Sequence, residues 1–101
     1  MILFDLDWLI TLLLISKVRG FRDSYSLTRV LAWKFNIINV VEITRKLEEN
    51  KLIERTPDKG NDKYEITAQG VAYINRNILE GKPILYNLYN SERDFIDALL
   101  V

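Results

Sequence analysis

Apolar residues between positions 39 and 50 recur with the period of an α-helix. Three of them share one side of such a helix: Val40, Ile43 and Leu47. The opposite side is polar and free to bind: Asn39, Glu42, Arg45, Lys46 and Glu49. Asn39 can cap the first free N–H groups, and Glu42 can reach back to the N–H of the cap. Asn50 tolerates the left-handed backbone that ends many helices. The pattern therefore predicts a helix over residues 39–50.

A hairpin is predicted directly after this helix. Residues 52–56 and 63–67 are short, alternating segments that tolerate β-structure. Between them stands PDKGND, a run of turn formers in which Pro57 interrupts the strand and Gly60 is conformationally permissive. We expect this hairpin tip to protrude into solvent.

The most apolar stretch of the chain, WLITLLLI at residues 8–15, is expected to be a central core helix. It is far shorter than the roughly 20 apolar residues of a membrane helix. Asp5 and Asp7 precede it where a secretory signal would carry basic residues. The helix is predicted over residues 5–18, with cations before Gly20 that suit its C-terminal end. We therefore expect no membrane association and a cytoplasmic location.

A second helix is predicted over residues 24–35, with Asp23 or one of the nearby serines as its cap. Its apolar residues form one stripe: Leu27, Val30, Leu31 and Phe35. The link to Asn39 then has the length of the turn in a helix-turn-helix. Ile37 or Ile38 is expected to be buried between the two helices.

Two more helices are predicted after the hairpin. Thr67 can cap a helix over residues 68–80, which Gly81 and Pro83 are expected to end. Its buried side would be formed by Val71, Ile74 and Ile78. Ser91 and Asp94 form a capping pattern ahead of apolar residues. This pattern predicts a short terminal helix over residues 92–100.

The stretch LEENKLIER at residues 47–55, followed by a polar loop and YEITAQG at residues 64–70, resembles MarR-like and PadR-like winged-helix transcription regulators. Lys51 stands where those proteins usually carry glycine. The resemblance implies that the helix at residues 39–50 lies in the DNA major groove. It also implies that the loop at residues 57–63, the wing, contacts the neighbouring backbone or minor groove.

These elements and the resemblance predict an α+β fold of the winged helix-turn-helix type. We expect a three-helix core, a two- or three-stranded β-wing and additional C-terminal helices. The 101 residues suit a single domain. Residues 1–83 would form the winged-helix core, and residues 84–101 a helical extension that offers a dimer interface.

Composition excludes several kinds of site. Cysteine and histidine are both absent from the sequence, which rules out thiolate and imidazole metal ligands, a cysteine nucleophile and a histidine base. We expect neither an enzyme nor a cofactor. The net charge is zero, with 14 basic and 14 acidic residues, whereas nucleic-acid-binding domains usually have a pI above about 9. Between Lys17 and Lys46, however, basic residues outnumber the acidic Asp23 and Glu42.

The candidate DNA contacts are basic or polar residues of the second helix and the segment before it, of the third helix and of the hairpin: Arg22, Arg29, Asn39, Thr44, Arg45, Lys46, Arg55, Lys59 and Lys63. Arg45 can pair with guanine, whereas the lysines and the remaining arginines suit phosphates. An alternative is that Glu42, Glu48 and Glu49 pair with the cations of their own helix, leaving a solvated face. Asn39 would then be only a cap, and the wing a solubilising turn.

The expected function is that of a small transcription regulator that binds double-stranded DNA. A homodimer is expected through the first helix and the terminal segment, because one such domain cannot readily bury all its aromatic residues. A tyrosine-rich cleft at that interface could hold a small effector. The alternative function is a winged-helix module that binds a protein partner and not DNA. An apolar patch around Trp33 or Tyr86 would favour this alternative, and a positive stripe through Arg29, Arg45, Lys46 and Lys59 would favour DNA.

Overall fold

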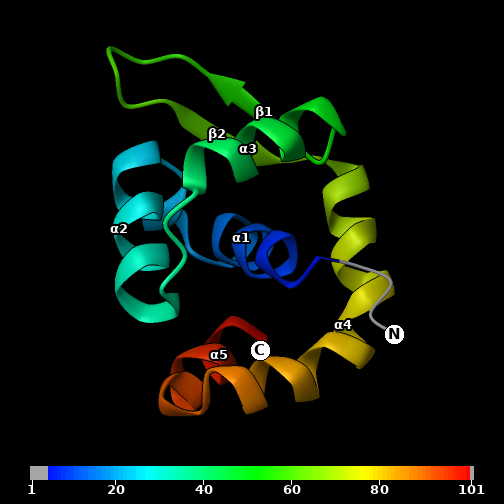
Figure 1. Ribbon diagram of the computed structural model, residues 1–101. Coiled ribbons are helices and arrows are strands. Elements are labelled where there is room, and N and C mark those ends of the chain that lie inside the picture. The colour runs from blue at the N-terminus through cyan, green and yellow to red at the C-terminus, as the bar shows by residue number, and fades with distance from the viewer. Residues whose placement is uncertain (1–4, 101) are drawn as a thin grey trace.

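The computed structural model describes residues 5–100, which form five α-helices and a two-stranded antiparallel sheet that lies at one edge of the molecule (Figure 1). The α-helices are α1 (Leu6–Lys17), α2 (Ser24–Phe35), α3 (Val40–Glu49), α4 (Ala68–Leu88) and α5 (Arg93–Leu100). The strands are β1 (Ile53–Thr56) and β2 (Lys63–Ile66), and short 3₁₀ turns occur at η1 (Arg19–Phe21) and η2 (Asn90–Glu92). The predicted α+β class is confirmed.

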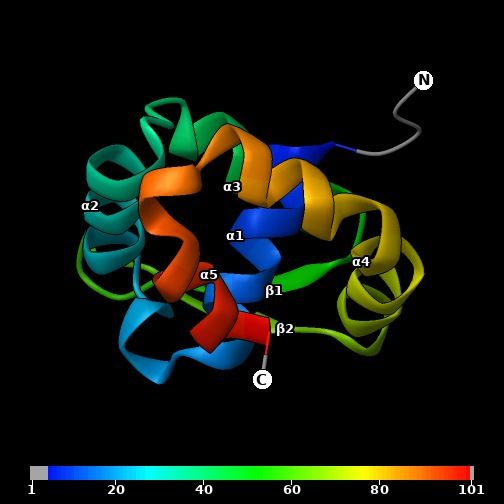
Figure 2. The ribbon, with the colours of Figure 1, turned by 90° about the horizontal axis from the view of Figure 1, so that it is seen from below.

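Helix α1 runs through the middle of the molecule and is covered on most sides (Figures 1 and 2). It contacts α2, α3, α4, α5 and β2. Its side chains from Leu9 to Ile15 are all buried, including the hydroxyl of Thr11, which donates to the carbonyl of Asp7 at 2.7 Å. The predicted central core helix is confirmed. Within residues 5–100, no helix combines the length and the apolar character needed to cross a membrane.

Helix α2 buries the predicted stripe, and of its candidate caps the structure uses Asp23. The Asp23 carboxylate accepts a hydrogen bond from the N–H of Ser26 at 3.0 Å. Asn36 ends the helix in the left-handed conformation, with a φ of 54°. In the link to α3, Ile37 is buried whereas the Ile38 side chain is 81% exposed. Only one of the two candidate isoleucines therefore packs between the helices.

Both ends of α3 differ from the prediction. Among the described residues, the side chain of Asn39 makes no capping hydrogen bond, because its backbone is not in the extended conformation that would aim it at the helix. Glu42 pairs with Lys46 instead of reaching back to Asn39. At the other end Asn50 is not left-handed, since its side-chain amide donates to the Lys46 carbonyl at 2.8 Å. The left-handed residue is Lys51, with a φ of 62°.

The hairpin pairs Ile53 with Ile66 and Thr56 with Lys63, and its tip reverses through left-handed Lys59 and Gly60. The segment before α2 adds an isolated bridge to the outer side of β2, between Asp23 and Lys63. The N–H of Ser24 donates to the Asp62 carbonyl at 2.8 Å. This third, very short pairing fastens the beginning of α2 to the hairpin.

Helix α4 begins at Thr67, as predicted. The Thr67 hydroxyl accepts a hydrogen bond from the N–H of Gly70 at 3.0 Å and donates to the Lys51 carbonyl at 2.7 Å. Gly70 is buried against the carbonyl oxygen of Leu52, where a β-carbon would not fit. The threonine and the glycine of the YEITAQG motif therefore dock the helix on the end of the α3–β1 turn.

The predicted end of this helix at Glu80 is wrong, because α4 continues through Gly81 and Pro83 to Leu88. Proline lacks the N–H that would bond to the carbonyl four residues earlier, and here the helix bends instead of ending (Figures 1 and 2). The proposed division between residues 83 and 84 thus falls inside one helix. The prediction that Val71 is buried is also wrong, since its side chain is 41% exposed.

The C-terminal segment packs against its own chain. Leu85, Ile96 and Leu99 are buried in the same core as α1. The Phe35 ring lies 5.1 Å from that of Tyr89, edge to face. Helix α5 begins directly from η2, so Ser91 lies inside that turn and does not cap the helix. The apolar surface expected at a dimer interface is therefore largely used within one chain.

Candidate nucleic-acid interface

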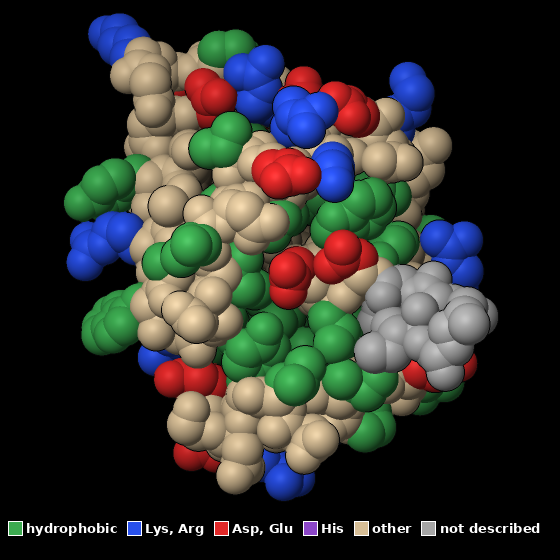
Figure 3. Space-filling model, in the orientation of Figure 1, with side chains coloured by type: hydrophobic (Ala, Val, Ile, Leu, Met, Phe, Trp, Pro, Cys, Tyr) green, Lys and Arg blue, Asp and Glu red, His purple; other side chains and the backbone are tan. Residues whose placement is uncertain are grey.

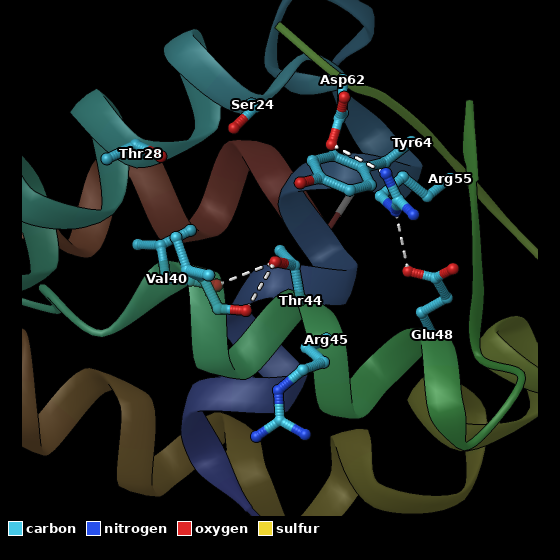
Figure 4. A pocket seen from close by; sticks show the side chains of 10 residues that line it. Ser24, Thr28, Val40, Thr44, Arg45, Glu48, Arg55, Asp62 and Tyr64 are labelled. Carbon is cyan, nitrogen blue, oxygen red and sulfur yellow. Dashed lines mark hydrogen bonds and ion pairs between the residues drawn. The ribbon is translucent and has the colours of Figure 1, made fainter. Parts of the chain in front are cut away.

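A hollow of about 300 Å³ opens between α2, α3 and the hairpin (Figure 4). Three elements line it: Ser24 and Thr28 come from α2, Val41 and Arg45 from α3, and Arg55 and Tyr64 from the hairpin. Hydroxyl and guanidinium groups are hydrogen-bond donors that suit phosphate oxygens. We therefore take this hollow and the outer face of α3 as the candidate site.

Arg55 is held between two carboxylates at one side of the hollow. Its Nε donates to Glu48 at 3.0 Å, and its Nη1 donates to Asp62 at 3.1 Å (Figure 4). The hydrogen bonds to Glu48 and then to Asp62 raise the pKa of Arg55. The guanidinium therefore stays charged, and its charge is balanced by its own neighbours.

The two cations on the outer face of α3 are also paired. Arg45 donates to Glu49 at 2.9 Å, and Lys46 lies 3.1 Å from Glu42. Both pairs span one helical turn and are about half exposed. Basic and acidic side chains alternate over α3 and the hairpin (Figure 3). The structure therefore has the alternative arrangement, in which the cations of α3 pair with acidic residues of the same helix.

Two of the predicted contact residues are turned inward. Thr44 is only 6% exposed, and its hydroxyl donates to the Val40 carbonyl at 2.9 Å. Arg22 donates from Nε to the Ile15 carbonyl at 2.8 Å and from Nη2 to that of Ser16 at 3.2 Å. It thereby satisfies carbonyls at the C-terminal end of α1, which have no partner within the helix. Thr44 lines the hollow, but its hydroxyl is already bonded within α3, and Arg22 is bonded to the end of α1.

Arg29 lies away from the other predicted residues. It is on the outer face of α2, and its guanidinium stands 5.6 Å from the centre of the Tyr25 ring. It lines a separate hollow with Phe21 and Trp33. Because Arg29 is on the outer face of α2, it does not form a continuous positive stripe with Arg45 and Lys46.

The remaining predicted residues are exposed on the candidate site or next to it. Asn39 precedes α3 and keeps an exposed side chain. Lys59 stands at the hairpin tip and Lys63 begins β2, and both are exposed. In the part of the chain that the structure describes, no carboxylate forms an ion pair with either lysine. The structure thus brings Arg45 and Arg55 to one hollow. It places Lys63 next to Asp23, with which it interacts electrostatically.

Several residues of the site were missed from the sequence. Ser24 and Thr28 are four residues apart and so share the side of α2 that faces α3. That spacing could have indicated them. Val41 is 81% exposed beside Arg45, although an apolar residue next to the buried Val40 is easily assigned to the core. Tyr64 is buried at the base of the hollow, where only the tertiary structure places it.

The beginning of α2 is held against the hairpin tip by side chains. Partial burial alone would raise the pKa of Asp23, but hydrogen bonds from Ser26 and Asn61 outweigh it and lower that pKa. Asn61 also accepts a hydrogen bond from the N–H of Tyr25 at 2.8 Å. These contacts fix the position of the hairpin tip relative to the beginning of α2.

The groups of this site do not form a metal centre. Among residues 5–100, no three acidic side chains are close enough to hold a metal ion. The site offers hydrogen-bond donors, paired cations and one exposed valine.

Comparison of the chain with protein-family models, with curated proteins and with solved structures found no match.

Proposed function

We propose that this protein is a DNA-binding domain of the winged helix-turn-helix type that acts in transcription regulation. In this proposal α3 enters the major groove of double-stranded DNA, and the hairpin tip contacts the neighbouring backbone. The observation that carries it is the order α2, short turn, α3 and hairpin, together with the bridge from Asp23 to Lys63 that fastens the hairpin to α2. The resemblance at residues 47–70 supports the same assignment.

The chemistry of α3 suits a groove surface. Val41 can contact a thymine methyl group, and Arg45 can pair with guanine once it leaves Glu49. Asn39 can bind adenine or a phosphate. Each of these side chains is exposed on the outer side of the helix or at its start.

The ion pairs determine how DNA would be bound. Exposed pairs at this spacing are weak, typically about 0.3–0.5 kcal/mol, so a phosphate can displace a carboxylate. The carboxylates then remain near the DNA and reduce the attraction. Lys59 forms no ion pair within the described residues, whereas Lys63 lies near Asp23 and helps to lower the pKa of that carboxyl group. Lys59 is therefore expected to make the larger contribution to the salt-dependent attraction.

Binding to a pool of random-sequence duplex DNA tests the proposal. We expect binding at low salt, about 50 mM, that weakens steeply with added salt, and enrichment of a preferred sequence on repeated selection. Arg45→Ala should relax that preference, whereas Lys59→Ala should lower the affinity for all sequences by the same factor. Lys82→Ala removes an exposed cation from α4 and serves as the control. Absence of binding at low salt, or equal binding by the Arg45→Ala, Lys59→Ala and wild-type proteins, would refute the proposal.

A further inference from the structure

Helix α2 presents a second exposed surface on the side turned away from α3. Tyr25, Arg29 and Trp33 are four residues apart and so follow one line along the helix. The Tyr25 side chain is 63% exposed and that of Trp33 is 80% exposed. We call these three residues the α2 outer face. Hydrophobic and basic side chains project at this edge of the molecule (Figure 3).

A hollow of about 230 Å³ lies beside the α2 outer face. Its walls are mainly apolar and include Phe21, Val30 and Trp33, while Arg29 and Lys34 stand at its border. Lys34 is partly neutralised, because its Nζ lies 3.3 Å from a Glu92 oxygen. No carboxylate pairs with Arg29 in the range 5–100. The surface thus combines an apolar hollow with an uncompensated positive charge.

Residue types of this kind dominate protein-binding surfaces. Tryptophan, tyrosine and arginine supply most of the binding energy at such interfaces, typically around an anchor side chain that enters a pocket. Exposed apolar patches bordered by polar groups likewise mark binding surfaces. The aromatic residues of the α2 outer face do not contribute to the hydrophobic core of the protein, since the side chains of Tyr25 and Trp33 both project into solvent.

We propose that the α2 outer face and its hollow bind a short acidic segment of a partner protein. An apolar side chain of that segment would fill the hollow against Phe21, Val30 and Trp33. Its flanking carboxylates would pair with Arg29. A nucleic-acid strand fits less well, since it would need a row of free cations and Lys34 is already bound to Glu92.

The surface is separate from the proposed DNA site, which lies on the other side of α2. Ser24 and Thr28 face α3, whereas Arg29 and Trp33 line the second hollow. Both surfaces could therefore be occupied together, so that a partner protein would be carried to DNA. Each surface can be altered without changing the other.

Selection from a display library of short random peptides, with the full chain as target, tests the proposal. We expect the enriched peptides to share an apolar residue flanked by aspartate or glutamate. For a synthesised member, Trp33→Ala and Arg29→Glu should each weaken binding about tenfold or more. Leu79→Ala removes an apolar side chain that is 85% exposed on α4 and should have no effect. Circular dichroism checks that each variant is folded.

Three results would overturn the proposal. The first is a failure to enrich any peptide, and the second is enrichment of peptides without acidic residues. The third is that oligo-dT or anionic lipid vesicles bind in a way that requires Trp33, whereas binding of the selected peptides does not require Trp33. A blue shift of tryptophan fluorescence on peptide binding, lost in Trp33→Ala, would support it, because Trp33 would pass from water into the interface.

Discussion

Gly70 lies directly against the carbonyl oxygen of Leu52, with no room for a β-carbon between them. A β-carbon at Gly70 would also meet the side chain of Ile66. Gly70→Ala must therefore push α4 away from the turn that follows α3. We expect it to lower the free energy of unfolding by about 1–3 kcal/mol, as overpacking of a buried site typically does. Chemical denaturation measures this change.

Gly20→Ala is the matched control for this prediction. A β-carbon at Gly20 meets nothing within 4 Å. The free energy of unfolding should therefore change by less than about 0.5 kcal/mol. Equal destabilisation by the two variants would show that the close approach of Gly70 to Leu52 is not what positions α4.

Leu85 tests whether the C-terminal segment belongs to the core of one chain. Its side chain is 1% exposed, whereas Leu88, one turn of α4 further on, is 59% exposed. We expect Leu85→Ala to destabilise the protein by about 2–5 kcal/mol and Leu88→Ala by far less. Thermal unfolding should also be independent of protein concentration. A melting temperature that rises with concentration, or similar effects of the two variants, would instead indicate that this segment is stabilised by a second chain.

Asp23 should make stability depend on pH at the acidic end. Its pKa is lowered in the folded protein, so the folded state favours the charged carboxylate. The resulting stabilisation is complete above the ordinary aspartate pKa of 3.8 and is lost as the pH falls through the lowered value. Asp23→Asn should therefore be less stable than wild type at neutral pH, and the difference should shrink below pH 3.8. Unfolding curves over this pH range measure it, and a constant difference would contradict the assignment.

Release of Arg55 should strengthen the proposed binding of DNA. Glu48→Gln and Asp62→Asn each remove one of the two carboxylates that hold its guanidinium. We expect the pair of substitutions to raise affinity for duplex DNA and to steepen its salt dependence by about one further phosphate contact. Fluorescence anisotropy at several salt concentrations gives both quantities.

Glu54→Gln separates this effect from a general change of charge. Glu54 is exposed on β1, opposite Glu65, and is not a partner of Arg55 among the described residues. Combined with Glu65→Gln, Glu54→Gln removes two negative charges, as the test pair does, without freeing the guanidinium. An equal gain in affinity from this double control would mean that net charge, and not the release of Arg55, controls binding.

The local sequence pattern was sufficient to predict the helices that have a clear apolar stripe and a polar cap. Leu27, Val30, Leu31 and Phe35 are all buried, and Asp23 and Thr67 both cap the helices they precede. The end of α4 could not be predicted, because Gly81 and Pro83 are local stop signals. Burial of Leu85 in the core outweighs them.

The candidate site was less predictable than the helices. The sequence allowed Arg45 and Lys46 either to stay free or to pair within their helix, and both pair. Arg22 satisfies carbonyls of α1, which no spacing in the sequence indicates. Such choices depend on which groups the tertiary fold brings near, so the sequence alone leaves them open.

The central position of α1 has a consequence for biosynthesis. This helix is synthesised before α4 and α5, which cover it in the folded chain. Until Ile96 and Leu99 have emerged, the side chains from Leu9 to Ile15 lack part of their final covering. While residues 18–99 are being made, the nascent chain therefore carries an incompletely covered apolar helix, and residues 9–15 are a segment that chaperones can bind during this interval.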